Sequence, residues 1–178
     1  MSRLFTRRLT IRPLERADLG VLTAWYADAD LMRHIGDGRA FTAAETELAL
    51  HRHLDFMARN GFGLMMAELQ ESGAPIGRVG FMEWDVDGAA LLEIGWLIAP
   101  EHQGAGFATE AGAALRRHGF VALDRPVLVS VIQPQNTASI RVAEKLGAVR
   151  WRSWTTPGGA DVVLYRYDRS ELTSGDGD

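Results

Sequence analysis

The feature that most constrains the fold is an apolar strand followed directly by a glycine pair and an alanine-rich run. Residues 89–99, AALLEIGWLIA, are apolar on both faces, as is typical of a strand in the middle of a sheet. Gly104 and Gly106 come next, and the pattern after them predicts a helix over residues 108–122. Glycines at this point let the backbone turn tightly or approach a ligand closely.

Two helices with clear start signals are predicted earlier in the chain. Asp18 is placed to cap a helix over residues 19–35, which the sequence GDGR then breaks. Thr42 and Glu45 have the spacing of a capping box at the start of a second helix. Gly61 follows the end of that helix, where glycine is the usual terminator.

Strands are predicted where residues alternate in polarity or form short apolar runs between turn signals. They cover residues 6–14, 61–69, 75–84, 89–99, 125–132, 148–156 and 161–168, and a further helix covers 137–147. The order β-α-α-β-β-β-α-β-α-β-β predicts an α+β fold, with helices on both faces of a mixed, mostly antiparallel sheet. We expect one domain over residues 1–170 and a disordered acidic tail over 171–178.

Composition and charge argue against several classes of protein. With a formal net charge of −4, the chain lacks the basic excess that is typical of a nucleic-acid binder. It has no apolar run that could span a membrane and no signal-peptide pattern. It also has no cysteine, and its five histidines do not cluster like metal ligands. We therefore expect a cytoplasmic protein without a metal, nucleic-acid or membrane partner.

The glycine pair fits one kind of phosphate site better than two others. A Walker loop needs lysine and serine or threonine where Phe107 and Ala108 stand. A Rossmann fingerprint needs a small residue where Thr109 stands. A pyrophosphate at the helix N-terminus remains, because unpaired N–H groups and the helix dipole favour an anion there. From the glycines alone, a tight turn without a ligand stays open.

Four motifs in order resemble one protein family. QGAGFA at 103–108 matches the pyrophosphate loop of the GNAT N-acetyltransferases, Gln/Arg-x-x-Gly-x-Gly/Ala. With TRRLTIRPL, IGRVGF, EIGWLIAPEHQGAGFATEA and NTASIRVAEKLGA, the chain resembles the type-3 branch, which acetylates ribosomal-protein N-termini, over residues 6–167. The resemblance implies the GNAT fold, acetyl-CoA as donor and an amine acceptor, either a protein N-terminus or a small amine. It leaves a homodimer open.

The resemblance also implies a set of acetyl-CoA contacts. They are Leu97, Ile98, Gln103, Gly104, Ala105, Gly106, Phe107, Ala108, Thr109, Asn136 and Lys145. Glu93 lies roughly 16 Å from Ile98 along an extended strand, which is the length of a pantetheine arm. The two pantetheine amides can pair with Leu97 and Ile98 only if this strand splays from the next one. Asn136 can contact pantetheine or cap a helix, and Lys145 can approach the adenosine phosphates.

Two side chains are candidates for the proton transfers. Glu93 is a single charge in an apolar strand, so we expect it to be the base that deprotonates the amine, or else a structural hydrogen-bonding group. Ser139 matches a family serine near the thioester sulfur and can protonate the thiolate. Many relatives carry a tyrosine where this chain has Ala143, which leaves Ser139 or water as the acid. Weaker candidates for the base are Glu68, Glu83, Asp85 and His102, while Trp84 and Trp96 are expected in the core.

Three functions remain to be compared. The first is an N-acetyltransferase that works by direct attack in a ternary complex, with the rate arising from orientation and polarisation. The second is a CoA-binding module without catalysis, which the missing tyrosine permits. A nucleotide-binding protein of another class is disfavoured, because the lysine and the third small residue are missing.

Overall fold

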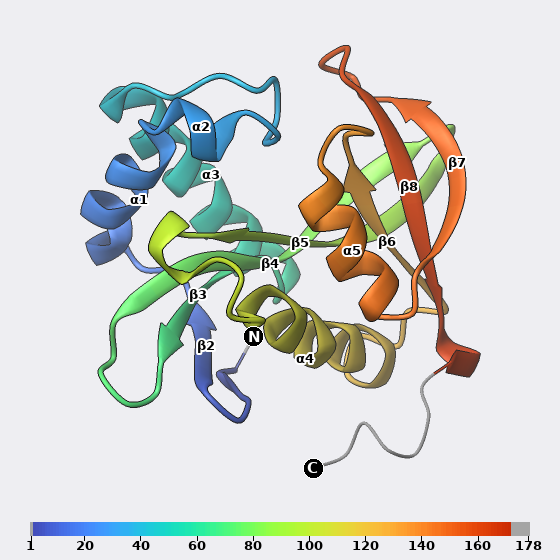
Figure 1. The fold of residues 1–178 in the computed structure, drawn as a ribbon, viewed down its shortest axis with the longest axis horizontal. Coiled ribbons are helices and arrows are strands. Elements are labelled where there is room, and N and C mark those ends of the chain that lie inside the picture. Colours follow the sequence, from blue (N-terminus) through green and yellow to red (C-terminus); the bar gives the residue numbers. More distant parts are fainter. Residues whose placement is uncertain (1, 172–178) are drawn as a thin grey trace.

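The computed structural model describes residues 2–171 and arranges them around one twisted sheet (Figure 1). The strands are β1 (Leu4–Phe5), β2 (Leu9–Pro13), β3 (Leu64–Leu69), β4 (Pro75–Val86), β5 (Ala89–Ile98), β6 (Val127–Ile132), β7 (Val149–Thr155) and β8 (Asp161–Asp168). The helices are α1 (Leu19–Tyr26), α2 (Ala29–Met32), α3 (Ala43–Asn60), α4 (Phe107–Val121) and α5 (Thr137–Lys145). Short 3-10 turns cover Arg16–Asp18, Pro100–His102 and Arg169–Glu171.

The sheet confirms the predicted α+β class. Its order is β1-β2-β3-β4-β5-β6-β8-β7, and among the described strands only β5 and β6 pair in parallel. The predicted antiparallel run of β3, β4 and β5 is present. The terminal hairpin inserts β8 between β6 and β7, which places β7 at the edge.

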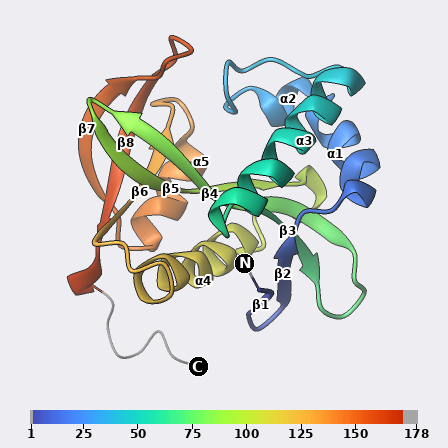
Figure 2. The same cartoon turned by 180° about the vertical axis from the view of Figure 1, so that it is seen from behind.

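Helices cover both faces of the sheet. Figures 1 and 2 show α4 and α5 on one face and α1, α2 and α3 on the other. A large apolar core packs under α4, and a smaller one lies under α1–α3. The long central strands β4 and β5 contribute residues to both cores. Packing on both faces therefore holds these strands in place, together with the side chains that they present on the α1–α3 face.

The predicted helix over residues 19–35 is wrong in its length and in its cap. The chain leaves the helical conformation after α1, because the Asp28 side chain accepts hydrogen bonds from two backbone N–H groups of α2 and starts a new helix. Asp18 precedes α1 but does not cap it with its side chain. Its carboxylate binds the Arg12 guanidinium at 2.7 Å and the Glu15 backbone N–H instead. A charged partner on β2 outcompetes the helix end.

The other helix signals are confirmed. Thr42 and Glu45 form the reciprocal capping box at the start of α3, and Gly61 ends that helix with a left-handed φ of 74°. No helix within residues 2–171 is long and apolar enough to cross a membrane. The predicted acidic tail lies outside the described residues except for Glu171, which ends a 3-10 turn.

Candidate active site

The loop between β5 and α4 presents unpaired amides at a helix N-terminus. Gly104 and Gly106 both have left-handed φ values, of 75° and 84°, and Gly106 is the N-cap of α4. Residues 103–106 are exposed. The first hydrogen bond of the helix runs from the Glu110 N–H to the Gly106 carbonyl, so the amides of residues 107–109 have no partner within the helix. This arrangement fits a pyrophosphate.

β5 and β6 separate beyond a short pairing, which is the condition that the pantetheine contacts implied by the family resemblance require. The parallel pairing of these strands covers only Leu92 and Glu93 of β5. Beyond it, the Ser130 hydroxyl donates to the Ile94 carbonyl at 2.8 Å. The Val131 N–H points at the Glu93 carboxylate, 3.4 Å away. Side chains therefore take hydrogen bonds that the β6 backbone would otherwise make, and the two strands separate.

The backbone groups of β5 that face this gap differ from those predicted. The Leu97 carbonyl is directed at β4, because a Cβ built on Gly77 would lie 2.5 Å from its oxygen. Backbone groups alternate along a strand, so Trp96 and Ile98 face the gap and Leu97 does not. The Ile98 carbonyl already accepts a hydrogen bond from the Gln103 side chain at 2.9 Å. Gln103 thereby ties the glycine loop to the end of β5.

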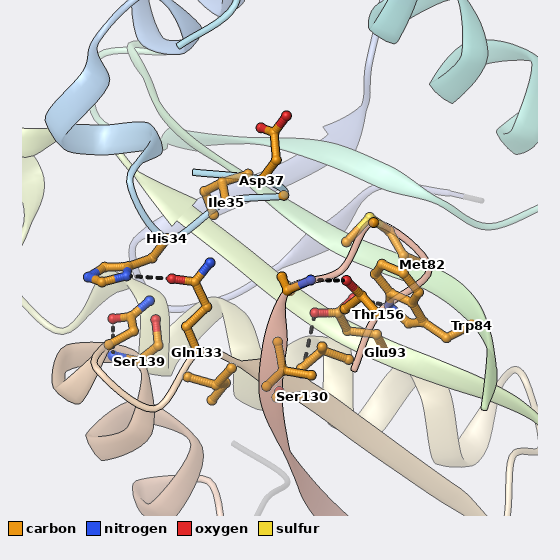
Figure 3. Close-up of a pocket in the computed structure, with 18 of the residues that line it drawn as sticks. His34, Ile35, Asp37, Met82, Trp84, Glu93, Ser130, Gln133, Ser139 and Thr156 are labelled. Atoms are coloured by element: carbon orange, nitrogen blue, oxygen red, sulfur yellow. Dashed lines mark hydrogen bonds between the residues drawn. The ribbon is translucent and has the colours of Figure 1, made fainter. Parts of the chain in front are cut away.

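At the inner end of the gap lies a cavity of about 370 Å³. It is bounded by the loop before α3, the middle of β4 and β5, the β6–α5 turn and the β7–β8 turn. Figure 3 shows Met82, Trp84 and Glu93 on one side of it, and His34 with Gln133 on the other. His34 Nδ1 and Gln133 Oε1 are 3.0 Å apart, so this pair links the loop after α2 to the β6–α5 turn.

Glu93 is buried at the wall of this cavity, with 6% of its surface exposed. The Trp84 indole N–H donates to Oε2, and the Val131 N–H approaches Oε1. Burial raises the pKa of Glu93 to about 7, while the two hydrogen bonds and the charge of Arg78 lower it by less. A carboxylate with such a pKa can accept and release a proton near neutrality. Both sequence interpretations of Glu93, as a base and as a structural group, are compatible with this geometry.

Two predicted residues at the N-terminal end of α5, Asn136 and Ser139, lie at the cavity. Asn136 is the N-cap of α5, and its Oδ1 accepts from the Ser139 N–H at 3.1 Å. Asn136 and Ser139 both line the cavity. Ala143 is buried in the core, and its methyl group cannot donate a proton as a tyrosine hydroxyl could. Lys145, at the end of α5, is exposed.

The expectation that Trp84 and Trp96 belong to the core is only half right. Both side chains are partly buried and line the cavity, and Trp84 orients the carboxylate of Glu93. None of the weaker candidates for the base lines the cavity. Glu68, for example, is ion-paired with Arg12 at 2.8 Å. Within residues 2–171 there is no group of three or more metal-ligating side chains.

Arg8 is a functional candidate that the local sequence does not reveal. Its Nη2 donates to the Ala105 carbonyl at 3.0 Å, and its Nε donates to Glu110 at 2.7 Å. The guanidinium carbon lies 4.1 Å from the centroid of the Phe107 ring. These contacts hold a cation beside the loop amides. The loop and Arg8 are 97 residues apart in sequence, so only the folded chain brings them together.

We expect Arg8→Met to raise the Kd for acetyl-CoA roughly tenfold, because a charge-assisted contact and the support of the Ala105 carbonyl are lost. Isothermal titration calorimetry measures this change. Arg7→Met is the matched control, since Arg7 is the exposed neighbour of Arg8. Equal losses in the two variants would mean that only net charge matters.

Comparisons with known proteins agree with this geometry. The type-3 family model described as "Acetyltransferase (GNAT) domain" matches residues 8–149. An acetyltransferase structure from Agrobacterium tumefaciens is 32% identical, with a TM-score of 0.82 and 95% of each chain covered. The uncharacterised N-acetyltransferase YnaD of Bacillus subtilis is 29% identical, over 82% of this chain and 81% of that protein.

The likeness in fold extends to the ribosomal-protein branch. The complex of RimL, a ribosomal L7/L12 α-N-protein acetyltransferase, with coenzyme A has a TM-score of 0.75 at 18% identity, covering 92% of this chain and 95% of that one. The family predicted from the four motifs is confirmed by the family model, which spans most of the domain. The chain therefore belongs to the GNAT family of acetyl-CoA-dependent N-acetyltransferases.

Proposed function

We propose that this enzyme acetylates a primary amine, either a protein N-terminal α-amine or a small-molecule amine, by direct attack within a ternary complex. One observation carries the proposal: the gap between β5 and β6 leads from the exposed loop at 103–106 to the cavity at Glu93. Acetyl-CoA supplies the acetyl group as a thioester. The chain holds both substrates in register, so it needs no covalent intermediate of its own.

The donor site follows from the free backbone and side-chain groups. The amides of residues 104–109 hold the pyrophosphate, with Arg8 beside them. The gap-facing backbone of Trp96 and Ile98 pairs with the pantetheine arm, as a peptide adds to a sheet edge. The Asn136 side chain faces the same gap with its amide NH₂ still available, because its oxygen caps α5. Lys145 adds positive charge near the adenosine phosphates.

The proton transfers use groups at the two sides of the cavity. Glu93 takes the proton from the attacking amine, directly or through water, and its pKa of about 7 suits that role. Ser139, or a water molecule near it, protonates the departing thiolate. A thiol titrates near 8.5, so the thiolate is a good leaving group that needs little help from an acid, and Ala143 in place of tyrosine is tolerable.

A thiol-release assay tests the proposal against ribosomal-protein N-terminal peptides, aminoglycosides and polyamines. We expect saturable release of CoA thiol with at least one acceptor class. Acetyl-CoA at a hundred times its Kd should raise the melting temperature by roughly 5–10 °C. ATP and NAD at the same concentration serve as controls and should leave it unchanged. A melting temperature that ignores acetyl-CoA, with no thiol released, would refute the proposal.

A further inference from the structure

Arg78 is a buried cation that has no ion-pair partner among residues 2–171. It lies on β4, 5% of its surface is exposed, and it lines the cavity that also holds Glu93. It makes no hydrogen bond or ion pair with any residue in the part of the chain that the structure describes, and its Nε is buried without a partner. Its guanidinium carbon lies 5.6 Å from the centroid of the Tyr26 ring. Burying a charge without a partner costs free energy, so the burial of Arg78 points to a negatively charged ligand that binds there.

The titratable groups around Arg78 do not supply a counter-charge. Burial raises the pKa of Tyr26, so its phenol stays neutral. Burial, followed by the charges of Arg78 and Arg52, lowers the pKa of His53 to about 4, so its ring is neutral near pH 7. The charge of Arg78 reaches Glu93, whose pKa it lowers, but the two side chains form no ion pair.

The register of β4 and β5 places Arg78 and Glu93 on the same face of the sheet. Arg78 is opposite Leu97. Glu93 lies four residues before Leu97 on β5, so the Cα atoms of Leu97 and Glu93 are about 13 Å apart along the strand. Gly80 and Gly95 are opposite each other between these two positions, so no side chain divides the floor there. The cavity therefore has a carboxylate near one end and an unpaired guanidinium near the other.

Three acidic residues on and beside the loop before α3 do not favour a cationic acceptor, and of these only Asp37 lines the cavity. Asp37 accepts from Arg39 at 3.0 Å, and Glu45 pairs with the same guanidinium at 2.8 Å. Asp30 is exposed and lies 4.0 Å from Arg33. Because these carboxylates have cationic partners already, they do not offset the positive charge of Arg78.

We propose that the acceptor is an amine that also carries a carboxylate, and that Arg78 is the specificity-determining residue that binds this carboxylate while the amine faces Glu93. The proposal rests on the acetyl transfer proposed above and narrows its substrate class. A free amino acid offers this chemistry, and so does a peptide N-terminus followed by an acidic side chain. A polyamine or aminoglycoside without a carboxylate does not.

Matched pairs of acceptors test the proposal in the thiol-release assay. The pairs are leucine with leucinamide, 4-aminobutyrate with butylamine, and two peptides that carry aspartate or asparagine at the second position. Spermidine is the cationic comparison. We expect kcat/KM to be roughly 10- to 150-fold higher for the carboxylate member of at least one pair, mainly through KM. The pair that shows the preference identifies the source of the carboxylate.

Arg78→Gln should abolish that preference, and Arg78→Lys should retain part of it. Arg59→Gln removes an exposed cation from α3 and is the matched control, in which the preference should persist. Unchanged affinity of Arg78→Gln for acetyl-CoA shows that the variant is folded. A merely structural role of Arg78 would lower activity on both members of a pair equally and would overturn the proposal.

Failure of the carboxylate proposal can be distinguished from failure of the acetyl transfer on which it rests. If amines are acetylated but acids and amides react equally, Arg78 binds no carboxylate, while the enzymatic function stands. If no amine reacts, titration of the CoA-saturated enzyme with N-acetyl-leucine and its amide gives the answer without turnover. Tighter binding of the acid, lost in Arg78→Gln, supports the Arg78 site, and equal or absent binding overturns it.

Discussion

Glu93→Gln should lower kcat/KM by about 10²- to 10⁴-fold, which is the usual contribution of a positioned general base. The glutamine keeps the shape of the side chain and can still accept the hydrogen bond from the Trp84 indole N–H. It cannot take a proton from the amine. In the wild type, kcat/KM should rise with pH through a step near pH 7, the pKa of Glu93. The variant should lose this step and keep only the step due to the acceptor amine.

The same substitution should stabilise the folded protein at alkaline pH. Burial raises the pKa of Glu93 from 4.5 to about 7, so the unfolded chain loses this proton at lower pH than the native protein does. The free energy of unfolding of the wild type therefore falls by about 3 kcal/mol in all as the pH rises from about 4.5 to 7. Above pH 7 the contribution of Glu93 no longer changes. Urea unfolding at pH 5 and pH 8 should show this loss in the wild type and its absence in Glu93→Gln.

Glu71→Gln is the matched control for both measurements. Glu71 is exposed in the β3–β4 turn, and replacing it should change neither kcat/KM nor the pH dependence of stability. Wild-type kcat/KM in Glu93→Gln would place the base elsewhere. A gain in stability without a loss of activity would leave Glu93 only a structural role.

Most of the fold could be predicted because its signals are local. The capping box of Thr42 and Glu45, the terminator Gly61 and the apolar run of β5 each act over a few residues, and each is present in the structure. The helix over 19–35 failed for a reason that local reading cannot detect. Asp18 had a competing partner, Arg12, that a strand brings to it. The position of β8 between β6 and β7 also depends on pairing across the sheet.

The candidate site likewise contains residues that local sequence signals reveal and residues that only the folded structure reveals. The glycine loop and Glu93 could be found from spacing and from a single charge in an apolar strand. That second signal does not mark Arg78, because its strand also carries Glu83 and Asp85, and its importance appears only when no ion-pair partner is found near it among the described residues. Arg8 and the hydroxyl of Ser130 could not be found, because each acts on a segment distant in sequence. Ser130 in particular replaces a ladder hydrogen bond and so helps to open the gap.

Gly106→Val should weaken acetyl-CoA binding by about 100-fold or more, the second large effect that we expect. Gly106 has a φ of 84°, a conformation that valine adopts only with strain. Relief of that strain rotates the backbone and turns the amides at the start of α4 away from a common point. Each charge-assisted hydrogen bond is worth about 1.5–3 kcal/mol, so the loss of two gives the expected change. Calorimetric titration with acetyl-CoA measures it.

The effect of backbone strain has to be separated from the loss of the amides that bind the pyrophosphate. Another glycine of the chain provides a matched control. Gly73, in the β3–β4 turn, has a φ of 71° and no atom within 4 Å of a built Cβ. Gly73→Val should therefore cost similar stability in urea unfolding and leave acetyl-CoA affinity unchanged. Gly106→Asn tolerates the left-handed conformation better and should bind acetyl-CoA more tightly than Gly106→Val. If all three variants bind acetyl-CoA like the wild type, the loop at 103–106 does not hold the pyrophosphate, and the donor must enter elsewhere.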